Sequence, residues 1–193
     1  MKDQATPQSE KPSRAKFVFD RSIKDAKQLL DHCKSLGHPL PQTAEVFKRA
    51  GLVMAMTAWE TYVEDRVLEA VKERIGQDPS YAAAFMLAKL DEELRRLHNP
   101  TWQKTKKLFE DYLQIDVTTF WRWQHVEPAV AIERLDALLK KRGDAVHRSS
   151  VHPDGLSKPH LVTKDELEKA IRFLEALVGA TDRAFWTGIQ KSV

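Results

Sequence analysis

The stretch that decides the fold reads Pro128-Ala-Val-Ala-Ile-Glu-Arg-Leu-Asp-Ala-Leu-Leu-Lys-Lys-Arg-Gly-Asp-Ala-Val-His-Arg148. Steps of three and four residues connect one series of positions in it, namely Ile132, Leu135, Leu139, Arg142 and Val146. This spacing is typical of one face of an amphipathic helix. The face is apolar except at Arg142, and a permanently charged guanidinium on such a face needs a partner or a ligand. The stretch therefore predicts a helix that ends around His147 and a special role for Arg142.

The same helical spacing extends over most of the chain. The stripe of a first helix consists of Phe19, Ile23, Ala26, Leu30 and Cys33. This helix is predicted to end near Gly37, and a second, longer one is predicted from about Gln42 to Ile75. Asp78-Pro79 is predicted to open a third helix and Asn99-Pro100 a shorter fourth, because these residues favour helix N-termini.

A C-terminal helix is predicted to begin at Thr163-Lys-Asp-Glu166, which matches a capping box. Its apolar stripe consists of Leu167, Ile171, Leu174, Val178 and Phe185. No segment shows the sustained alternation that is typical of strands. We therefore expect an all-α fold, an up-and-down helical bundle with extra short helices. Residues 1–15 are expected to form a flexible N-terminal tail, and residues 16–193 a helical bundle domain.

Net charge, cysteine content and the distribution of apolar residues limit the classes of function that the chain can have. The chain has 193 residues, 31 Lys plus Arg and 28 Asp plus Glu, for a net charge of +3. That excess is too small to indicate nucleic-acid binding by itself. Cys33 is the only cysteine, which excludes an intrachain disulfide and favours a core position in a reducing compartment. No stretch is predicted to act as a secretory signal or to cross a membrane, so a cytoplasmic protein without membrane contact is expected.

The second long helix carries carboxylates within an apolar pattern. Its spacing connects Val46, Ala50, Val53, Thr57, Glu60, Glu64, Val67 and Val71. Buried carboxylates need a cation, and we expect Glu60 to pair with Arg142 and to orient its guanidinium, with Glu64 in support. Two plainer explanations stay open: the pair holds two helices in register, or both glutamates reach solvent at the edge of the bundle.

His147 follows Arg142 by five residues, so an ideal helix points the two side chains about 140° apart. Gly143 lowers the helix propensity between them and permits some adjustment. Asp144 could orient the imidazole or form a surface pair with Arg148. A plainer role for His147 is to stabilise a helix C-terminus. Lys140, Lys141 and Arg148 add local positive charge that could attract phosphates, although a solvated basic face is commoner.

An Arg-x4-His pair near the end of a bundle helix resembles the hallmark of the HEPN superfamily, which is Arg-x4-6-His. The matching residues are Arg142 and His147. The stretch Ala50-Gly-Leu-Val-Met-Ala-Met-Thr-Ala-Trp-Glu-Thr-Tyr-Val-Glu64 is similar to the long helix of the RiboL-PSP branch. The organisation resembles that branch over roughly residues 17–186. Gly143 departs from the pattern, since many catalytic members place Asn, Asp or His directly after the arginine.

The resemblance implies a homodimeric endoribonuclease that needs no metal or cofactor, with Arg142 and His147 as catalytic residues. Attack of a ribose 2'-OH on the adjacent phosphate requires a base and an acid, and two protomers supply two motif histidines. The products would carry 2',3'-cyclic phosphate ends. The resemblance also implies a toxin or defence setting, with a cognate antitoxin or regulatory protein as partner. Lys140, Lys141 and Arg148 would contact RNA.

Three other interpretations remain open at this point. His147, His152 and His160 could form a metal site, although their spacing matches no established zinc pattern. A second RNA-binding region could be formed by Trp102, Lys104, Lys106, Lys107, Phe120, Trp121, Arg122 and Trp123, but core aromatics and solvated lysines are the plainer expectation. The whole chain could instead be a non-catalytic helical module that binds protein or RNA.

Overall fold

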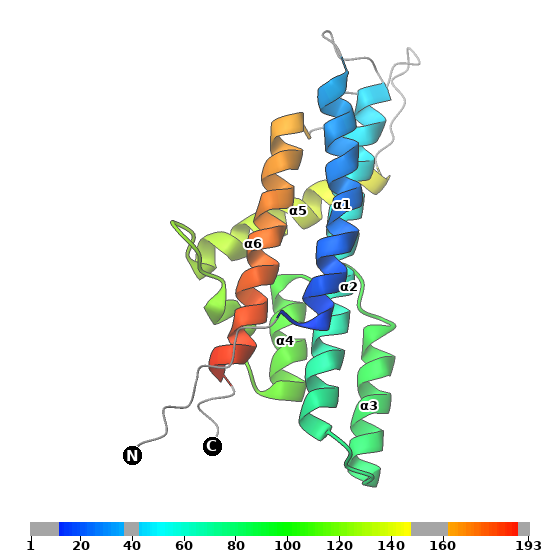
Figure 1. Ribbon diagram of the computed structural model, residues 1–193, viewed down its shortest axis with the longest axis vertical. Coiled ribbons are helices and arrows are strands. Elements are labelled where there is room, and N and C mark those ends of the chain that lie inside the picture. The colour runs from blue at the N-terminus through cyan, green and yellow to red at the C-terminus, as the bar shows by residue number, and fades with distance from the viewer. Residues whose placement is uncertain (1–11, 37–42, 148–161, 189–193) are drawn as a thin grey trace, which may run out of the picture.

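The protein is described by a computed structural model for residues 12–36, 43–147 and 162–188 (Figure 1). Its elements in chain order are α1 (Arg14–Ser35), α2 (Thr43–Ile75), α3 (Tyr81–Leu94), α4 (Trp102–Leu113), a 3-10 helix η1 (Val117–Phe120), α5 (Pro128–His147) and α6 (Lys164–Gly188). The described ranges contain no β-strand, and one isolated bridge joins Trp123 and Val126. The predicted all-α class is confirmed.

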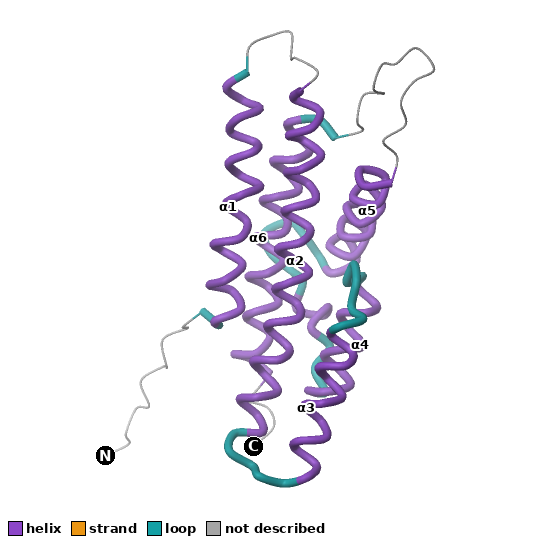
Figure 2. The backbone as a smooth tube through the Cα atoms, turned by 90° about the vertical axis from the view of Figure 1, so that its right-hand side faces the viewer, coloured by secondary structure: helices purple, strands orange, loops and turns teal. Residues whose placement is uncertain are grey.

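Three long helices form the body of the bundle. Helices α1, α2 and α6 run side by side along the long axis of the molecule (Figure 1). Helix α3 lies beside the C-terminal half of α2, whereas α5 crosses nearer the N-terminal half (Figure 2). The long helices are thus covered differently at their two ends, and this difference determines which faces of α2 are buried.

The core follows the two stripes that the sequence predicted for α1 and α6. Their stripe residues are all buried, from Phe19 to Cys33 in α1 and from Leu167 to Phe185 in α6. Trp59 of α2 and Trp121 fill the centre, with ring centroids 6.2 Å apart. Each indole N–H has an acceptor, the Pro100 carbonyl at 3.2 Å and the Thr181 hydroxyl at 2.9 Å. The aromatic core therefore buries large apolar area without leaving these donors unsatisfied.

Two predicted helix starts were placed too early. The cap of α3 is Ser80, whose hydroxyl accepts from the Ala83 N–H, while Asp78 accepts from Ser80. The cap of α4 is Thr101, whose hydroxyl accepts from the Lys104 N–H. In both cases a serine or threonine a short distance after the expected cap makes the capping hydrogen bond. Proline then lies just outside the helix rather than at its first position.

The start of the bundle domain also lies earlier than expected. Helix α1 begins at Arg14 with Ser13 as its cap, and Ala15 is buried. Residues 13–15 therefore belong to the bundle rather than to the predicted tail. Residues 1–11 of that tail lie outside the described residues.

The predicted apolar stripe of α2 is wrong for its N-terminal half. Val67 and Val71 are buried, but Val46 is 53% exposed and Thr57 is exposed as well. The buried face at that level is turned toward α1 and α6 instead. At Gly51, an added Cβ would lie 2.9 Å from a Leu167 methyl carbon. The physical reason for the open stripe is that α3 lies against the C-terminal half of α2 alone (Figure 2).

Candidate functional site at the end of helix α5

Arg142 lies on the inward side of α5, as the sequence predicted. Ala131, Leu135 and Ala145 are the buried residues of this helix, and Arg142 falls into their spacing of three and four. Val146, which was assigned to the same stripe, is 46% exposed. Because the inward line is centred on Ala131 and Leu135, its last position falls on Ala145 rather than on Val146. The prediction for Val146 was therefore wrong.

The guanidinium of Arg142 has no internal counterion in the described part of the chain. The side chain is half-buried, and its Nε is buried without a hydrogen-bond partner. A buried donor that lacks an acceptor costs roughly 1–3 kcal/mol. A site that retains such a donor is suited to an external acceptor, and a phosphate oxygen fits a guanidinium well.

The expected ion pair between Glu60 and Arg142 is not formed among the described residues. Helix α2 does pack against α5. However, Glu60 Oε1 lies 3.7 Å from Nδ1 of His98, which follows α3. Helix α5 crosses α2 nearer its N-terminal half (Figure 2). The carboxylate of Glu60 therefore lies near the connection after α3 instead of the motif arginine.

Glu64 belongs to an acidic neighbourhood. Burial raises the pKa of its carboxyl, and Glu60 and Asp65 raise it further, while His98 lowers it. The sequence interpretation that placed the two glutamates at the edge of the bundle describes their half-buried positions best. Neither carboxylate forms an ion pair with Arg142 within the described ranges.

A different carboxylate reaches the motif helix. Lys141, next to Arg142, donates to Glu166 Oε1 at 2.7 Å. Glu166 Oε2 accepts from the Thr163 N–H at 2.8 Å, and the Thr163 hydroxyl accepts from the Glu166 N–H at 3.2 Å. The predicted capping box is thereby confirmed. Hydrogen bonds from Lys141 and Thr163 lower the pKa of the Glu166 carboxyl.

The structure describes only some of the other residues predicted for the site. His147 is the last residue of α5, and its side chain is not among the described atoms. Asp144 is half-buried and Lys140 is exposed. Arg148, His152 and His160 lie outside the described residues, as does the alternative metal site that they would help to form. No cluster of three or more His, Cys, Asp or Glu suited to a metal occurs within the described ranges.

The structure favours the plainer explanation for the aromatic and basic region that was considered as a second RNA-binding surface. Trp121 is fully buried in the core. The lysines of α4 are engaged locally, since Lys104 donates to the His98 carbonyl, Lys106 to Asp116 and Lys107 to Asp111. These contacts support the plainer explanation of core aromatics and solvated, paired lysines.

The core assignment of Cys33 is supported. The thiol is buried and lies 3.7 Å from the Ala44 carbonyl oxygen. Burial raises the pKa of this thiol, and the smaller effects of Lys48 and Lys164 do not reverse the direction. A raised pKa disfavours the thiolate, so Cys33 is a poor nucleophile.

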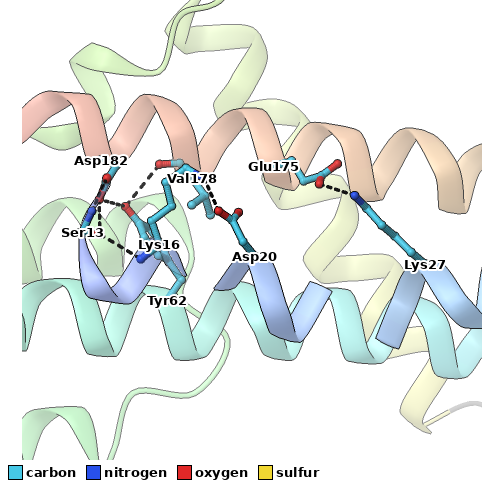
Figure 3. Close-up of polar contacts among 8 residues, drawn as sticks. All are labelled: Ser13, Lys16, Asp20, Lys27, Tyr62, Glu175, Val178 and Asp182. Carbon is cyan, nitrogen blue, oxygen red and sulfur yellow. Dashed lines mark hydrogen bonds and ion pairs between the residues drawn. The ribbon is translucent and has the colours of Figure 1, made fainter. Parts of the chain in front are cut away.

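The sequence analysis missed a second inward arginine. Arg66 of α2 is 4% exposed, its Nε lies 3.1 Å from Asp182 Oδ1, and its guanidinium carbon lies 3.8 Å from the Phe185 ring centroid. Asp182 also accepts from the Ser13 hydroxyl at 2.5 Å and from the Tyr62 hydroxyl at 3.4 Å (Figure 3). This buried cluster joins α1, α2 and α6.

A neighbouring carboxylate reinforces that cluster. Glu69 of α2 accepts from the backbone N–H groups of Arg14 and Ala15, at 2.8 and 2.9 Å. Both donors belong to the first turn of α1, where intrahelical acceptors are lacking. A signal for the cluster was present in the sequence, since Arg66 follows Tyr62 by four residues and Asp182 follows Val178 by four.

The described helices place the chain in the class of all-α helical bundles. The family model described as RiboL-PSP-HEPN matches residues 20–187. The chain therefore belongs to the RiboL-PSP-HEPN family, and the resemblance noted from the sequence is confirmed at this level. No curated protein and no solved structure matches the chain. None of the described helices is long and apolar enough to span a membrane.

Proposed function

We propose that the protein is a metal-independent endoribonuclease that acts as a homodimer. The observation that carries this proposal is the buried Nε of Arg142, which has no hydrogen-bond partner among the described residues. The arginine lies five residues before His147 at the end of α5. A fixed guanidinium with free donors is suited to bind the phosphate and to stabilise charge that develops on it.

The proposed reaction is transesterification within the RNA chain. The 2'-oxygen attacks the adjacent phosphorus, the P–O5' bond breaks, and a 2',3'-cyclic phosphate and a 5'-hydroxyl result. One histidine takes the 2'-OH proton while another delivers a proton to the leaving 5'-oxygen. Because each chain contributes one motif histidine, His147 of two protomers would fill the two roles. Asp144 would orient the imidazole, and Lys140, Lys141 and Arg148 would contact the RNA backbone.

Exposed apolar side chains on α2 and on the motif helix support the dimer. Val46 and Met54 of α2 are 53% and 40% exposed, and Val146 of α5 is 46% exposed. Removing such side chains from water favours association. A second copy that covers Val146 would lie close to the end of the motif helix.

Cleavage of single-stranded RNA in excess EDTA tests the proposal. Wild-type protein is compared with Arg142→Gln, His147→Ala and a matched control, Arg134→Gln, which changes an exposed arginine of the same helix. We expect cyclic phosphate ends from wild type and control, and loss of cleavage in both motif variants. Equal cleavage by all four proteins, or cleavage that stops when metal is chelated, would contradict the mechanism.

A non-catalytic binding module is the second candidate. The specific observation in its favour is an apolar outer face on α3, where Tyr81 is 84% exposed and stacks with Phe85 at a centroid distance of 6.2 Å. Such a face suits a protein partner, and an antitoxin or regulatory protein in a defence system is the partner that we propose. In this case Tyr81→Ala would weaken partner binding, and His147→Ala would leave every RNA property unchanged.

A further inference from the structure

Glu166 occupies a junction between two helices that no catalytic assignment includes. One carboxylate oxygen accepts from Lys141 near the end of α5, and the other accepts from the Thr163 N–H at the start of α6. Lys141 and Glu166 are separated by 25 positions in the sequence. The contact therefore links the end of the motif helix to the start of the C-terminal helix.

The described side chains at the end of α5 are mostly only half-buried. In its last five residues Ala145 is buried, while Val146 is exposed. Gly143 lies in the same turn, and a Cβ built there meets no atom within 4 Å. Glycine lowers helix propensity, and the last carbonyls of a helix lack intrahelical donors. A weak tie at this end can therefore change the local order of the helix substantially.

We propose that Glu166 is a positioning residue for the motif: its carboxylate, held by the cap of α6, keeps the last turns of α5 wound and tied through Lys141 to the start of α6. The catalytic consequence rests on the proposed ribonuclease function, whereas the structural consequence does not. Glu166 would act through Lys141 on Arg142 and on the backbone of His147, without touching RNA.

The capping box makes Glu166 better suited to this role than an ordinary surface carboxylate. An exposed ion pair contributes little, partly because two long side chains lose conformational freedom. Here the glutamate side chain is already held by Thr163, so Lys141 meets an acceptor in a set position. Lys34 and Glu168 form a comparable interhelical pair at 2.9 Å, but that pair joins α1 to α6 and does not reach α5.

Amide hydrogen exchange of the 193-residue chain tests the contact between Lys141 and Glu166 directly. Glu166→Gln retains an oxygen that can accept from Thr163 but loses the charge that attracts Lys141. We expect exchange of the amides of residues 141–147 to become about two- to fivefold faster, the range of a surface ion pair. The matched control Glu168→Gln should leave these amides unchanged. Unchanged exchange in Glu166→Gln would overturn the proposal.

Variants of the lysine identify the ion pair as the cause. Lys141→Met should accelerate exchange at the same amides to the same extent as Glu166→Gln. The double variant should add nothing further, because each change removes the same interaction. Lys141→Arg, which preserves the charge, should keep the amides of residues 141–147 as protected from exchange as in wild type. Additive effects of the two single changes would contradict a shared contact.

Kinetics of RNA cleavage separate positioning from simple stability. With Glu166→Gln we expect kcat to fall about two- to fivefold, at unchanged KM and unchanged melting temperature. If wild type does not cleave RNA, the proposed function fails. The exchange experiment still shows whether the contact between Lys141 and Glu166 orders the end of α5. If wild type cleaves and Glu166→Gln has faster exchange but an unchanged kcat, the positioning role is overturned and the ribonuclease function stands.

Discussion

Arg66 and Arg142 are both arginines on inward helix faces, and their surroundings differ. Arg66 is almost fully buried, with the Asp182 carboxylate at 3.1 Å and the Phe185 ring beneath its guanidinium. Arg142 is half-buried and forms no ion pair within the described residues. The buried Nε atoms of both arginines lack a hydrogen-bond partner, so the difference between the two lies in the counterion. The first arginine is neutralised by the fold itself, whereas the second would bind a phosphate under the proposed function. The same sequence signal, a cation on an apolar stripe, thus marks two different roles.

The largest effect is expected at the paired arginine. Asp182→Ala removes the counterion of Arg66 and also acceptors of Ser13 and Tyr62. Loss of one partner from a buried ion pair costs about 3–5 kcal/mol, because the remaining charge is left uncompensated. We expect a decrease of that size in the free energy of unfolding, measured by urea denaturation.

A double variant sharpens this prediction. In Arg66→Met with Asp182→Leu, no uncompensated charge remains, and much of the lost stability should return. If the single variant Asp182→Ala unfolds at the same urea concentration as wild type, the buried cluster does not hold the three helices together.

Removal of the unpaired guanidinium should lower activity without loss of stability. Arg142→Gln breaks no ion pair in the described structure and removes a buried donor that lacks an acceptor, so we expect the free energy of unfolding to stay level or to rise by up to about 1–3 kcal/mol. Loss of a donor that stabilises transition-state charge lowers kcat by about 100- to 1000-fold. RNA cleavage and urea denaturation of one preparation measure both quantities. A variant that cleaves normally but unfolds easily would reverse the comparison between the two arginines.

One added methyl group at Gly143 should stabilise the end of α5, the helix that carries Arg142 and His147. Gly143→Ala adds a Cβ that meets no atom within 4 Å. Alanine favours a helix interior over glycine by about 1 kcal/mol, so we expect a gain of up to that amount. Thermal denaturation measures the gain, and Gly179→Ala in α6 is a suitable control for another helical glycine. A loss of stability would mean that Gly143 is needed for a conformation other than regular helix.

The smallest effect on stability is expected for Glu64, a carboxylate that pairs with neither arginine in the described structure. Burial, Glu60 and Asp65 raise the pKa of Glu64, so its charged form is less favourable in the folded than in the unfolded protein. Glu64→Gln should stabilise the protein at pH 7 by a few tenths of a kcal/mol, since solvent screens a half-exposed group.

The sign of the pH dependence follows from the raised pKa. Wild type gains stability relative to Glu64→Gln as the pH falls through the folded-state pKa of Glu64, because the unfavourable charge is then neutralised. The advantage of the variant should therefore disappear at acid pH. Melting temperatures of both proteins between pH 3 and pH 7 test this, and an advantage that grows as the pH falls would contradict it.

Elements with strong local signals were predicted well. The helix from Pro128 to His147 and the capping box of Thr163 and Glu166 agree with the structure. The starts of α3 and α4 were misplaced because several neighbouring residues can cap a helix. At the candidate site, the inward position of Arg142 was predicted, while the contact of Lys141 with Glu166 was not.

The sequence by itself determined the helices, the family and the inward face of Arg142, because helical periodicity and capping depend on residues close together in the chain. Tertiary structure alone decided the partners of the charged side chains. Glu60 lies beside His98 and Arg66 beside Asp182, and both pairs join segments far apart in sequence. It also decided that α3 lies beside the C-terminal half of α2 (Figure 2), and that Val46 and Thr57 of the predicted apolar stripe are exposed.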